Sequence, residues 1–239
     1  RVMTTGSTGD DLKLVSATPQ PSGLDIKIMA RDVSYDLRLP LIGGFQAENA
    51  LLAAGIVIAS GEPVEKVLPL LEKLSGVPGR MQHVAGINFD AGSAGIYVDY
   101  AHTPDAVETA LLGVRPHAKG QVIAIIGAGG DRDKAKRSLM GKAAALYADA
   151  VIVTDDNPRT EDPAMIRQQI LKGCPEAAEI GDRGQAIAAG VAQLSAGDVL
   201  LIAGKGHETG QQVGMEILPF SDEEAAIAAA LNRMKELGR

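Results

Sequence analysis

The chain has 239 residues, of which 46% are hydrophobic and 22% charged, a composition typical of a globular protein with one large or two modest domains. The formal net charge of -7 argues against a nucleic-acid partner bound through a broad basic surface. The single cysteine excludes an internal disulfide, and no apolar run reaches the roughly 18 residues of a membrane span. We therefore expect a cytoplasmic monomer that acts on small molecules, with no nucleic-acid or membrane partner.

The first third of the chain predicts antiparallel strands followed by helices. Apolar and polar residues alternate between residues 12 and 41, and strands over 24–28 and 33–39 are separated by Ala30-Arg31-Asp32, a pattern typical of a hairpin or meander. Residues 46–60 predict a largely buried helix, and a second helix is expected from about Pro63 to residue 74. The breaker-rich stretch 75–80 is the predicted domain boundary, so we expect domains over 1–80 and 81–239.

From residue 81 onward the pattern changes to repeated strand–loop–helix units. Strands are predicted over 96–99, 122–126, 151–154, 178–180 and 199–202. Helices are predicted over 104–114, 138–147, 163–172, 184–194 and 222–237, with an edge hairpin near 211–218. Such alternation predicts an α/β domain with a doubly wound, mostly parallel, Rossmann-like sheet. Ligands of such sheets bind beyond the carboxyl ends of the strands.

The loop after residue 126 reads Gly127-Ala128-Gly129-Gly130-Asp131-Arg132. A glycine-rich turn of this kind either cradles a phosphate or only makes a tight strand-to-helix connection. The dinucleotide spacing lacks its third glycine, because Arg132 occupies that position, and no phosphate-binding loop of the Walker A type occurs in the chain. Basic residues follow at Lys134, Lys136 and Arg137, and they favour a carboxylate or phosphate ligand.

The run Asp156-Asn157-Pro158-Arg159 follows the apolar strand near residue 152. An ordinary Asn-Pro turn is the alternative interpretation. We prefer a clamp in which Arg159 and Arg132 hold a carboxylate while Asp156 and Asn157 hold an ammonium or amide group. Together these groups suit an amino acid.

Two further strand-end loops carry candidate site residues. In Gly204-Lys205-Gly206-His207-Glu208, the glycines allow a close approach of the backbone to a ligand, and Glu208 can receive an amino group. After residue 98, Asp99 and His102 are free to contact a ribose or phosphate, although Thr103 or Asp105 can simply cap the next helix. His83, His117 and Cys174 lack such a setting, and no pair of residues has the spacing of metal ligands.

Five ordered motifs resemble those of the Mur ligases. They are Gly79-Arg80-Met81, Val98-Asp99-Tyr100-Ala101-His102-Thr103-Pro104, Gly129-Gly130-Asp131-Arg132-Asp133-Lys134, Asp156-Asn157-Pro158-Arg159 and Gly204-Lys205-Gly206-His207-Glu208. The form Asp-Asn-Pro-Arg resembles the members that use meso-diaminopimelate, whereas lysine-adding members generally differ at the Arg. The resemblance covers nearly the whole chain.

The resemblance implies a domain assignment and a set of ligand contacts. Residues 1–80 would be the last part of a central ATP-binding domain, and 81–239 a complete amino-acid-binding domain. By the family's pattern, diaminopimelate is held by Arg132, Asp156, Asn157, Pro158, Arg159, Gly204 and Glu208. ATP is contacted by Asn49, Arg80, Asp99 and His102. Gln46 stands where the family usually has Asn, and Gly210 where an aromatic residue often follows, which would loosen the wall of the pocket.

The implied reaction belongs to peptidoglycan synthesis. ATP, with Mg²⁺, phosphorylates the glutamate carboxylate of UDP-N-acetylmuramoyl-L-alanyl-D-glutamate, and the diaminopimelate amine attacks the acyl phosphate. The family's phosphate-binding loop and carboxylated lysine are absent from the sequence, and the first residue is Arg1 rather than Met. We therefore expect a piece of a longer protein that binds ligands but does not catalyse the ligation alone, and we assign no catalytic or metal-ligating residue within it.

Three alternatives remain open. A lysine-adding ligase of the same family is disfavoured by Arg159, which would be left unpaired beside a lysine side chain. A non-catalytic module that binds an amino acid or nucleotide would use the same loops. A dinucleotide-dependent dehydrogenase is the weakest reading, because the third glycine is missing.

Overall fold

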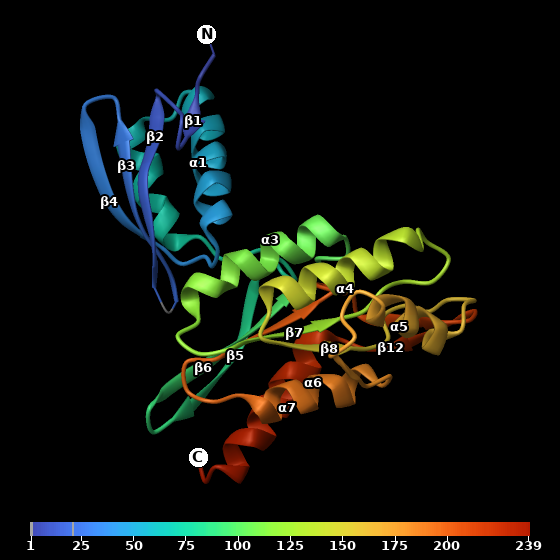
Figure 1. Ribbon diagram of the computed structural model, residues 1–239. Coiled ribbons are helices and arrows are strands. Elements are labelled where there is room, and N and C mark those ends of the chain that lie inside the picture. Colours follow the sequence, from blue (N-terminus) through green and yellow to red (C-terminus); the bar gives the residue numbers. More distant parts are fainter. Residues whose placement is uncertain (1, 21) are drawn as a thin grey trace. The chain divides into compact units, whose positions relative to one another are not determined.

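The computed structural model describes residues 2–20 and 22–239, which form two compact units that divide between Gly76 and Val77 (Figure 1). The first unit contains β1 (Thr5–Gly6), β2 (Leu12–Gln20), β3 (Gly23–Ala30), β4 (Val33–Leu39), α1 (Gly44–Ala59), α2 (Val64–Val67) and the 3₁₀ helix η1 (Leu68–Lys73). The strands of the second unit are β5 (Gln82–Phe89), β6 (Gly92–Asp99), β7 (Val122–Ile126), β8 (Ala150–Val153), β9 (Ala178–Glu179), β10 (Val199–Ala203), β11 (Gly210–Val213) and β12 (Glu216–Pro219). Its helices are α3 (Pro104–Val114), η2 (Arg115–His117), α4 (Ala135–Tyr147), α5 (Pro163–Leu171), α6 (Arg183–Gln193) and α7 (Asp222–Glu236).

The first unit is a four-stranded sheet packed against helices. The strand order is β1-β2-β3-β4, with β1 parallel to β2 and the other pairs antiparallel, so the predicted meander is confirmed. Strand β2 has a register shift against β3 between Leu14 and Ser16. The core of the first unit is aliphatic and includes Leu12, Leu24, Ile28, Leu39, Leu51 and Leu68.

The continuous helix predicted from Pro63 to residue 74 is wrong in its second half. An α-helical turn, α2, leads directly into the 3₁₀ helix η1, which begins at Leu68. Pro69 lacks a backbone N–H and its ring crowds the carbonyl of the preceding turn, so the α-helical pattern cannot continue through it. The change to 3₁₀ geometry still leaves Leu68 and Leu71 buried in the core of the first unit.

The second unit is built on a six-stranded sheet in the order β5-β6-β10-β7-β8-β9. All neighbouring strands are parallel except β5 and β6, which confirms the predicted mostly parallel, doubly wound α/β fold. In Figure 1, α3 and α4 cover one face of this sheet while α6 and α7 cover the other. Strand β10 lies between β6 and β7, so the strand order reverses at this point of the sheet. The predicted site loops follow the strands beside this reversal.

Burial explains why the central strands were predictable and one edge strand was not. All five residues of β7 and all five of β10 are buried, as their continuous apolar sequences require. Strand β5 was not predicted, and only Ile87 of its eight residues is buried.

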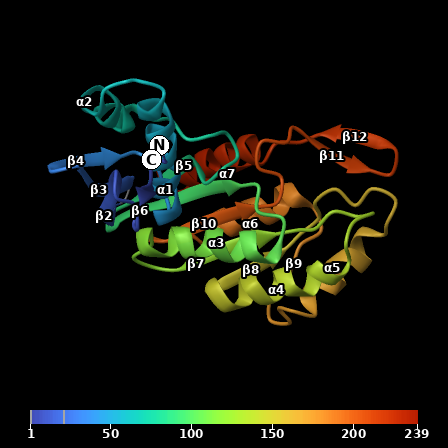
Figure 2. The ribbon, with the colours of Figure 1, turned by 90° about the horizontal axis from the view of Figure 1, so that it is seen from above.

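Figure 2 shows the predicted edge hairpin, formed by β11 and β12, extending away from the sheet. Within the described residues, none of the helices combines the length and the apolar character that a membrane crossing requires.

Candidate functional site

The carboxyl ends of four parallel strands are aligned at one edge of the second unit's sheet. The registers pair Ala203 of β10 with Asp99 of β6, and Ile126 of β7 with Val153 of β8. The loops after these strands are the ones that the sequence singled out. Their backbones also meet directly, because Gly204 N donates to Asp99 O at 3.0 Å and Thr154 N donates to Ile126 O at 2.9 Å. The predicted site residues of this unit therefore lie along a single edge.

The loop after β7 and the loop after β8 are bound to each other by hydrogen bonds. Gly130 N donates to Asn157 O at 2.9 Å, and the Thr160 hydroxyl donates to the Asp131 carboxylate at 2.7 Å. Gly130 has no room for a side chain, since a Cβ there would meet the carbonyl of Pro158. This contact gives Pro158 a structural role in the loop, beside its predicted contact with a ligand.

An ion pair between Arg137 and Glu161 reinforces the contact between these two loops. Arg137 of α4 has no exposed surface, and its guanidinium donates to both carboxylate oxygens of Glu161, at 2.9 and 3.0 Å. It also donates to Gly129 O at 3.0 Å. The hydrogen bonds from Arg137 hold the pKa of Glu161 well below its ordinary range, with further contributions from Asp131 N–H and Lys134. The two arginine-bearing loops are thus held in one arrangement by charged contacts.

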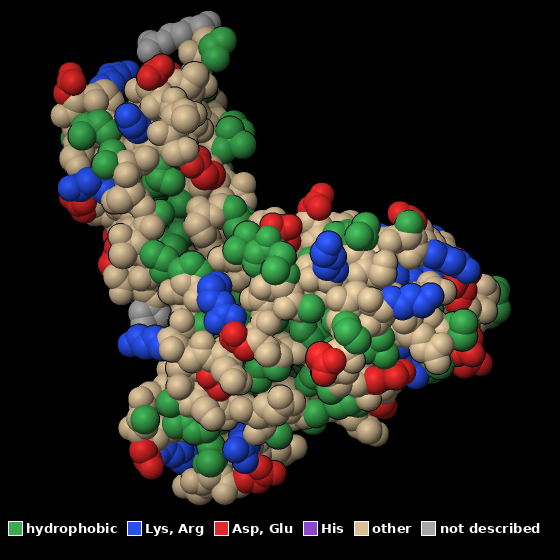
Figure 3. Space-filling view, in the orientation of Figure 1, with side chains coloured by type: hydrophobic (Ala, Val, Ile, Leu, Met, Phe, Trp, Pro, Cys, Tyr) green, Lys and Arg blue, Asp and Glu red, His purple; other side chains and the backbone are tan. Residues whose placement is uncertain are grey.

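Arg159 and Arg132 occupy different settings in these loops. Arg159 adopts a left-handed conformation with φ of 51°, which is costly for a residue with a side chain. Its Nη1 donates to Gly130 O at 2.8 Å, and within the described residues Nη2 and Nε have no hydrogen-bond acceptor. Arg132 is exposed, and its Nη1 donates to Asp131 O at 3.0 Å. In Figure 3, Lys and Arg side chains gather over the loop that leads into α4.

The predicted ammonium-binding residues form a connected cluster. Asn157 Nδ2 donates to Glu208 Oε2 at 2.9 Å, so the loops after β8 and β10 meet through two predicted site residues. Asn157 Oδ1 accepts from Lys205 Nζ at 2.9 Å and from Gln212 N at 2.9 Å. Lys205 is fully buried, and its Nζ also lies 3.4 Å from Glu208 Oε2. The cluster therefore contains a cation that the sequence did not single out.

Asp156 lies directly against Gly204. A Cβ on Gly204 would be 2.5 Å from Asp156 Oδ2, and the φ of 127° at Gly204 also favours glycine. Behind this contact, the buried Arg183 donates to both oxygens of Asp222, at 2.6 and 2.7 Å, and to Ala203 O at 3.0 Å. Asp156 and Gly204 thus lie next to each other, with a fixed ion pair supporting the end of β10.

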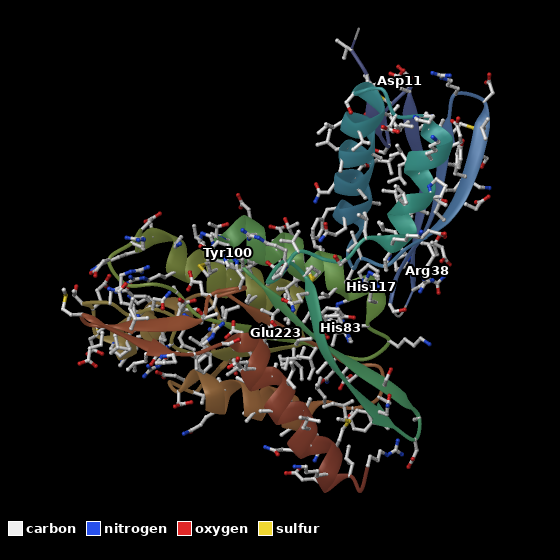
Figure 4. All side chains as sticks on the ribbon, turned by 180° about the vertical axis from the view of Figure 1, so that it is seen from behind. Asp11, Arg38, His83, Tyr100, His117 and Glu223 are labelled. Carbon is white, nitrogen blue, oxygen red and sulfur yellow. The ribbon has the colours of Figure 1, made fainter. Side chains whose placement is uncertain are left out.

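The loop after β6 forms a second group around an aromatic ring. The Asp99 carboxylate accepts from Met81 N at 2.7 Å and from Ala101 N at 2.8 Å, while burial raises its pKa above the ordinary value. Arg80 lies over the ring of Tyr100, 4.4 Å from its centroid, and Tyr100 is labelled in Figure 4. His102 Nδ1 lies 2.8 Å from Tyr100 O. Arg80, Asp99 and His102 therefore lie around Tyr100, and their contact with ATP stays a prediction.

Two glycines bring this group against the loop after β10. Gly79 has a φ of 67°, and a Cβ there would meet His207 N and Gly206. Gly206 has a φ of 56°, and a Cβ there would lie 2.8 Å from both Gly79 O and Tyr100 Cβ. The ring of His207 lies 5.6 Å from that of Tyr100. The motif around Arg80 and the motif around Glu208 are thus packed together.

Asn49, the remaining predicted ATP contact, belongs to the other unit. It is an exposed residue of α1, and its Nδ2 lies 3.4 Å from Gln46 Oε1.

The predicted capping role of Thr103 is confirmed, because its hydroxyl accepts from Ala106 N at 3.3 Å at the start of α3. His83 packs beside Tyr97 with ring centroids 5.1 Å apart. Cys174 is buried, and burial raises its thiol pKa to about 11.

A cavity of about 340 Å³ adjoins the far side of the loop after β8. Its walls include Asp155, Asp182, Arg183, Gln211 and Phe220. The charged groups in it already have partners: Asp155 accepts from Arg167 at 2.5 Å, Asp182 caps α6 and Arg183 pairs with Asp222. Asp155 and Arg183 in this cavity are therefore already paired with opposite charges, whereas no salt bridge to Arg159 is found among the described residues.

The prediction missed Glu161, Arg183, Lys205 and Gln212, which connect the site. It also gave Arg137 the wrong role, because this residue was expected to favour a carboxylate or phosphate ligand but is fully buried and paired with Glu161. Most of them lie on elements whose role appears only in three dimensions. Lys205 did carry a signal, because a lysine between two glycines at the end of an apolar strand is placed where parallel sheets bind ligands.

Comparisons with known proteins agree on one family. The sequence model described as "Mur ligase, glutamate ligase domain" matches residues 79–206. The UDP-N-acetylmuramoyl-L-alanyl-D-glutamate--2,6-diaminopimelate ligase of Caulobacter vibrioides is 54% identical over 228 residues, which are 95% of this chain and 46% of that protein. The enzyme of the same name from Mesorhizobium japonicum is 49% identical over 97% of this chain and 47% of its own length. The chain thus spans about half the length of these curated relatives.

Solved structures show the same fold. A structure of a UDP-N-acetylmuramoyl-L-alanyl-D-glutamate--2,6-diaminopimelate ligase superposes with a TM-score of 0.67 at 33% identity, over 97% of this chain and 46% of that chain. The MurF ligase of Thermotoga maritima, solved in complex with ADP, has a TM-score of 0.63 at 18% identity, over 97% of this chain and 48% of its own. The second likeness is one of fold alone.

Proposed function

The chain belongs to the Mur ligase family, and on that premise we propose that it is part of an ATP-dependent, amide-forming ligase of peptidoglycan synthesis. The whole protein would add meso-diaminopimelate to UDP-N-acetylmuramoyl-L-alanyl-D-glutamate. The printed names of relatives about 50% identical support this substrate, as do the strand-end groups of the second unit. Because ATP and UDP-linked precursors are cytoplasmic, the reaction would take place in the cytoplasm.

The observation that carries this proposal is that Arg159 and the carboxylates of Asp156 and Glu208 lie on adjoining loops at one edge of the sheet. Arg159 retains two guanidinium nitrogens without a protein acceptor among the described residues, as a carboxylate ligand requires. Asp156 and Glu208 offer carboxylates for an ammonium group, and they lie on loops joined through Asn157. A cation and anions held at fixed positions are complementary to an amino acid in its zwitterionic form.

Discrimination between diaminopimelate and lysine follows from the same arginine. The two amino acids differ by one carboxylate, which we assign to Arg159 with help from the exposed Arg132. A bound lysine would place a hydrogen or a methylene group next to the guanidinium and leave it desolvated without a partner. The hydrogen bond from Arg159 Nη1 to Gly130 O holds one end of the guanidinium in place, on a residue whose backbone has a φ of 51°.

We further propose that the first unit is the last part of the ATP-binding domain and the second unit the amino-acid-binding domain. Arg80, Asp99 and His102 would contact ATP from the second unit, and Asn49 from the first. In the reaction, the substrate carboxylate attacks the γ-phosphate of ATP and releases ADP. The amine of diaminopimelate then attacks the acyl carbon, an amide bond forms and inorganic phosphate leaves.

The chain's own residues would act by binding and orientation. Asp156, Glu208 and Arg159 hold the amino acid so that one amine points toward the acyl phosphate, which makes the attack effectively unimolecular. Mg²⁺ is expected on the ATP phosphates of the whole protein. The described parts of the chain contain no group of three side chains that could hold a metal, so we assign no step to it here.

Binding of the free amino acids to the chain tests this proposal. We expect saturable binding of meso-diaminopimelate by ligand-detected NMR, no measurable binding of L-lysine, and loss of diaminopimelate binding in Arg159→Ala. Arg233→Ala is the matched control, because it removes an arginine that pairs with Glu236 on α7. Equal binding of lysine would contradict the assignment of the second carboxylate to Arg159.

A hybrid enzyme tests the activity of the whole protein. Residues 1–239 would replace the matching part of the Caulobacter vibrioides ligase, to which they are 54% identical. We expect ATP-dependent ligation of diaminopimelate by the hybrid, and loss of it with Arg159→Ala. A folded hybrid that joins lysine equally well, or that joins neither amino acid, would count against the proposal.

A further inference from the structure

Lys205 is a buried cation at the centre of the proposed amino-acid site. It follows β10, between Gly204 and Gly206, and none of its side-chain surface is exposed. Removing an ammonium group from water costs free energy unless hydrogen-bond acceptors surround it. A lysine is therefore fully buried only where such acceptors are held beside it. The partners of Lys205 therefore indicate what its charge does.

Both partners of Lys205 Nζ are residues that we assign to the substrate. The ammonium group donates to Asn157 Oδ1 at 2.9 Å and lies 3.4 Å from Glu208 Oε2. These two residues come from different loops, after β8 and after β10. One buried charge thus joins the two loops at the point where the amino acid would bind.

The contacts fix the orientation of the Asn157 amide. Its Oδ1 accepts from two donors, Lys205 Nζ and Gln212 N, each at 2.9 Å. A flipped amide would place its NH₂ group against both donors, so Nδ2 must point toward Glu208. Without Lys205, a single backbone donor would remain to distinguish the two orientations.

The two oxygens of the Glu208 carboxylate have different surroundings. Oε2 accepts from Asn157 Nδ2 and lies beside Lys205 Nζ, whereas Oε1 has no hydrogen-bond partner among the described residues. The Glu208 side chain is 35% exposed, so its carboxylate is within reach of a ligand. Oε1 is therefore the oxygen available to an incoming ammonium group.

We propose that Lys205 is a positioning residue for the amino-acid substrate: it does not touch the ligand, but fixes Asn157 and aims Glu208 Oε1 at the ligand's ammonium group. This inference rests on the function proposed above. It assigns the selectivity for an amino group to a three-residue network rather than to Glu208 alone.

Substitution of Lys205 tests the network, with binding and side-chain NMR as separate readouts. Lys205→Met keeps the length and apolar stem but removes the ammonium, and Lys205→Gln keeps a donor without the charge. Lys142→Met is the matched control, because Lys142 is an exposed residue of α4. The binding readout is the Kd for meso-diaminopimelate, and the structural readout is the chemical shift and exchange rate of the Asn157 side-chain amide protons without ligand.

We expect Lys205→Met to raise the Kd by about tenfold or more, the size of a lost hydrogen bond to a charged group. The Asn157 amide signals should shift and exchange faster in this variant, and Lys205→Gln should restore them in part. Lys142→Met should change neither readout. A folded Lys205→Met with unchanged Asn157 signals and a Kd within about twofold of the original would overturn the proposal.

Two further outcomes remain decisive. If Lys205→Met does not fold, the ¹⁵Nζ resonance of Lys205 in the unsubstituted chain becomes the readout, and it must shift on addition of diaminopimelate. An unshifted resonance at saturation would overturn the positioning role. If the unsubstituted chain binds no diaminopimelate, the proposed function fails, whereas altered Asn157 signals in a folded Lys205→Met would still support the network.

Discussion

Arg183 and Asp222 form an ion pair from which water is excluded, since neither side chain has exposed surface. Burial alone would lower the pKa of Arg183, but the adjacent Asp222 carboxylate outweighs it and the pKa remains above its ordinary value. Asp222→Asn would leave the guanidinium charge buried without its counter-ion. We expect the free energy of unfolding to fall by about 3–5 kcal/mol in urea titrations.

The control for this prediction is Glu224→Gln, which removes an exposed acid from the same first turn of α7. It should change stability by less than about 1 kcal/mol, since a charge at a helix N-terminus contributes only modestly. If Asp222→Asn were as mild as this control, the ion pair would not support the end of β10 as argued above.

The second prediction at the residue scale concerns pH and Glu161. Hydrogen bonds from Arg137 lower the pKa of Glu161 from its ordinary value of 4.5. A carboxyl group with a depressed folded-state pKa contributes its full stability above the unfolded value and loses it as the pH falls toward the folded value. The stability difference between the original chain and Glu161→Gln should therefore be constant near neutral pH and shrink below about pH 4.5.

Urea midpoints of the two proteins between about pH 7 and pH 3 check this sign. A difference that grows as the solution becomes acidic would show that the Arg137–Glu161 pair is not what stabilises the ionised carboxylate. Lys134→Met, which removes the weaker and exposed partner at 3.1 Å, should give a smaller effect with the same pH dependence.

At the scale of elements, the packing of α4 on α5 depends on a glycine. A Cβ at Gly141 of α4 would overlap Ile170 O of α5 and lie 3.0 Å from Cys174 Sγ. Alanine is the better helix former, by about 1 kcal/mol, but here the overlap is with backbone that cannot move alone. We expect Gly141→Ala to destabilise the chain by about 1–3 kcal/mol in urea titrations.

Gly190→Ala of α6 is the comparison, because its Cβ would approach only the side-chain atoms of Ile125 and Leu200, at 3.0 and 3.1 Å. Side chains can shift, so this substitution should cost less than Gly141→Ala or be neutral. The reverse order of the two effects would contradict the idea that α4 and α5 approach each other through backbone.

The elements that were predicted correctly share a strong local signal. The apolar runs of β7 and β10 could be buried only inside a parallel sheet, and Pro104 and Pro163 mark the first residues of α3 and α5. Strand β5 has no such signal, since seven of its eight residues keep some exposure. It is a strand because it pairs with β6, which is a tertiary cause that local sequence does not record.

The candidate site also contains residues that local sequence indicated and residues that it did not. Residues such as Asp99, Asn157 and Glu208 were identifiable because parallel sheets bind ligands at the ends of their strands. Arg137 and Arg183, which support these loops, lie on helices. The sequence suggested a ligand contact for Arg137, and a lone arginine such as Arg183 is usually solvated. Their burial follows from which helix packs beside which loop. Local sequence therefore indicates candidate contacts better than it indicates the residues that support them.

At the scale of the whole molecule, the two units have separate cores. The core of the first unit draws on residues from Leu12 to Leu71, and that of the second on residues from Ile87 to Ala230. Residues 72–78, where the units divide, are exposed. All proposed contacts with diaminopimelate lie in the second unit, as does Lys205, so the proposal assigns the choice of amino acid to this unit alone.

This arrangement predicts that residues 77–239, produced alone, fold and retain the choice of amino acid. We expect one cooperative urea transition, because the described core cluster around β6, β7 and β10 is built from residues of this unit and the chain divides just before Val77. Its Kd for meso-diaminopimelate should lie within about threefold of that of the 239-residue chain, and L-lysine should again not bind, since no proposed contact has been removed. A folded 77–239 that binds both amino acids equally, or binds neither while the longer chain binds diaminopimelate, would show that the first unit completes the amino-acid site.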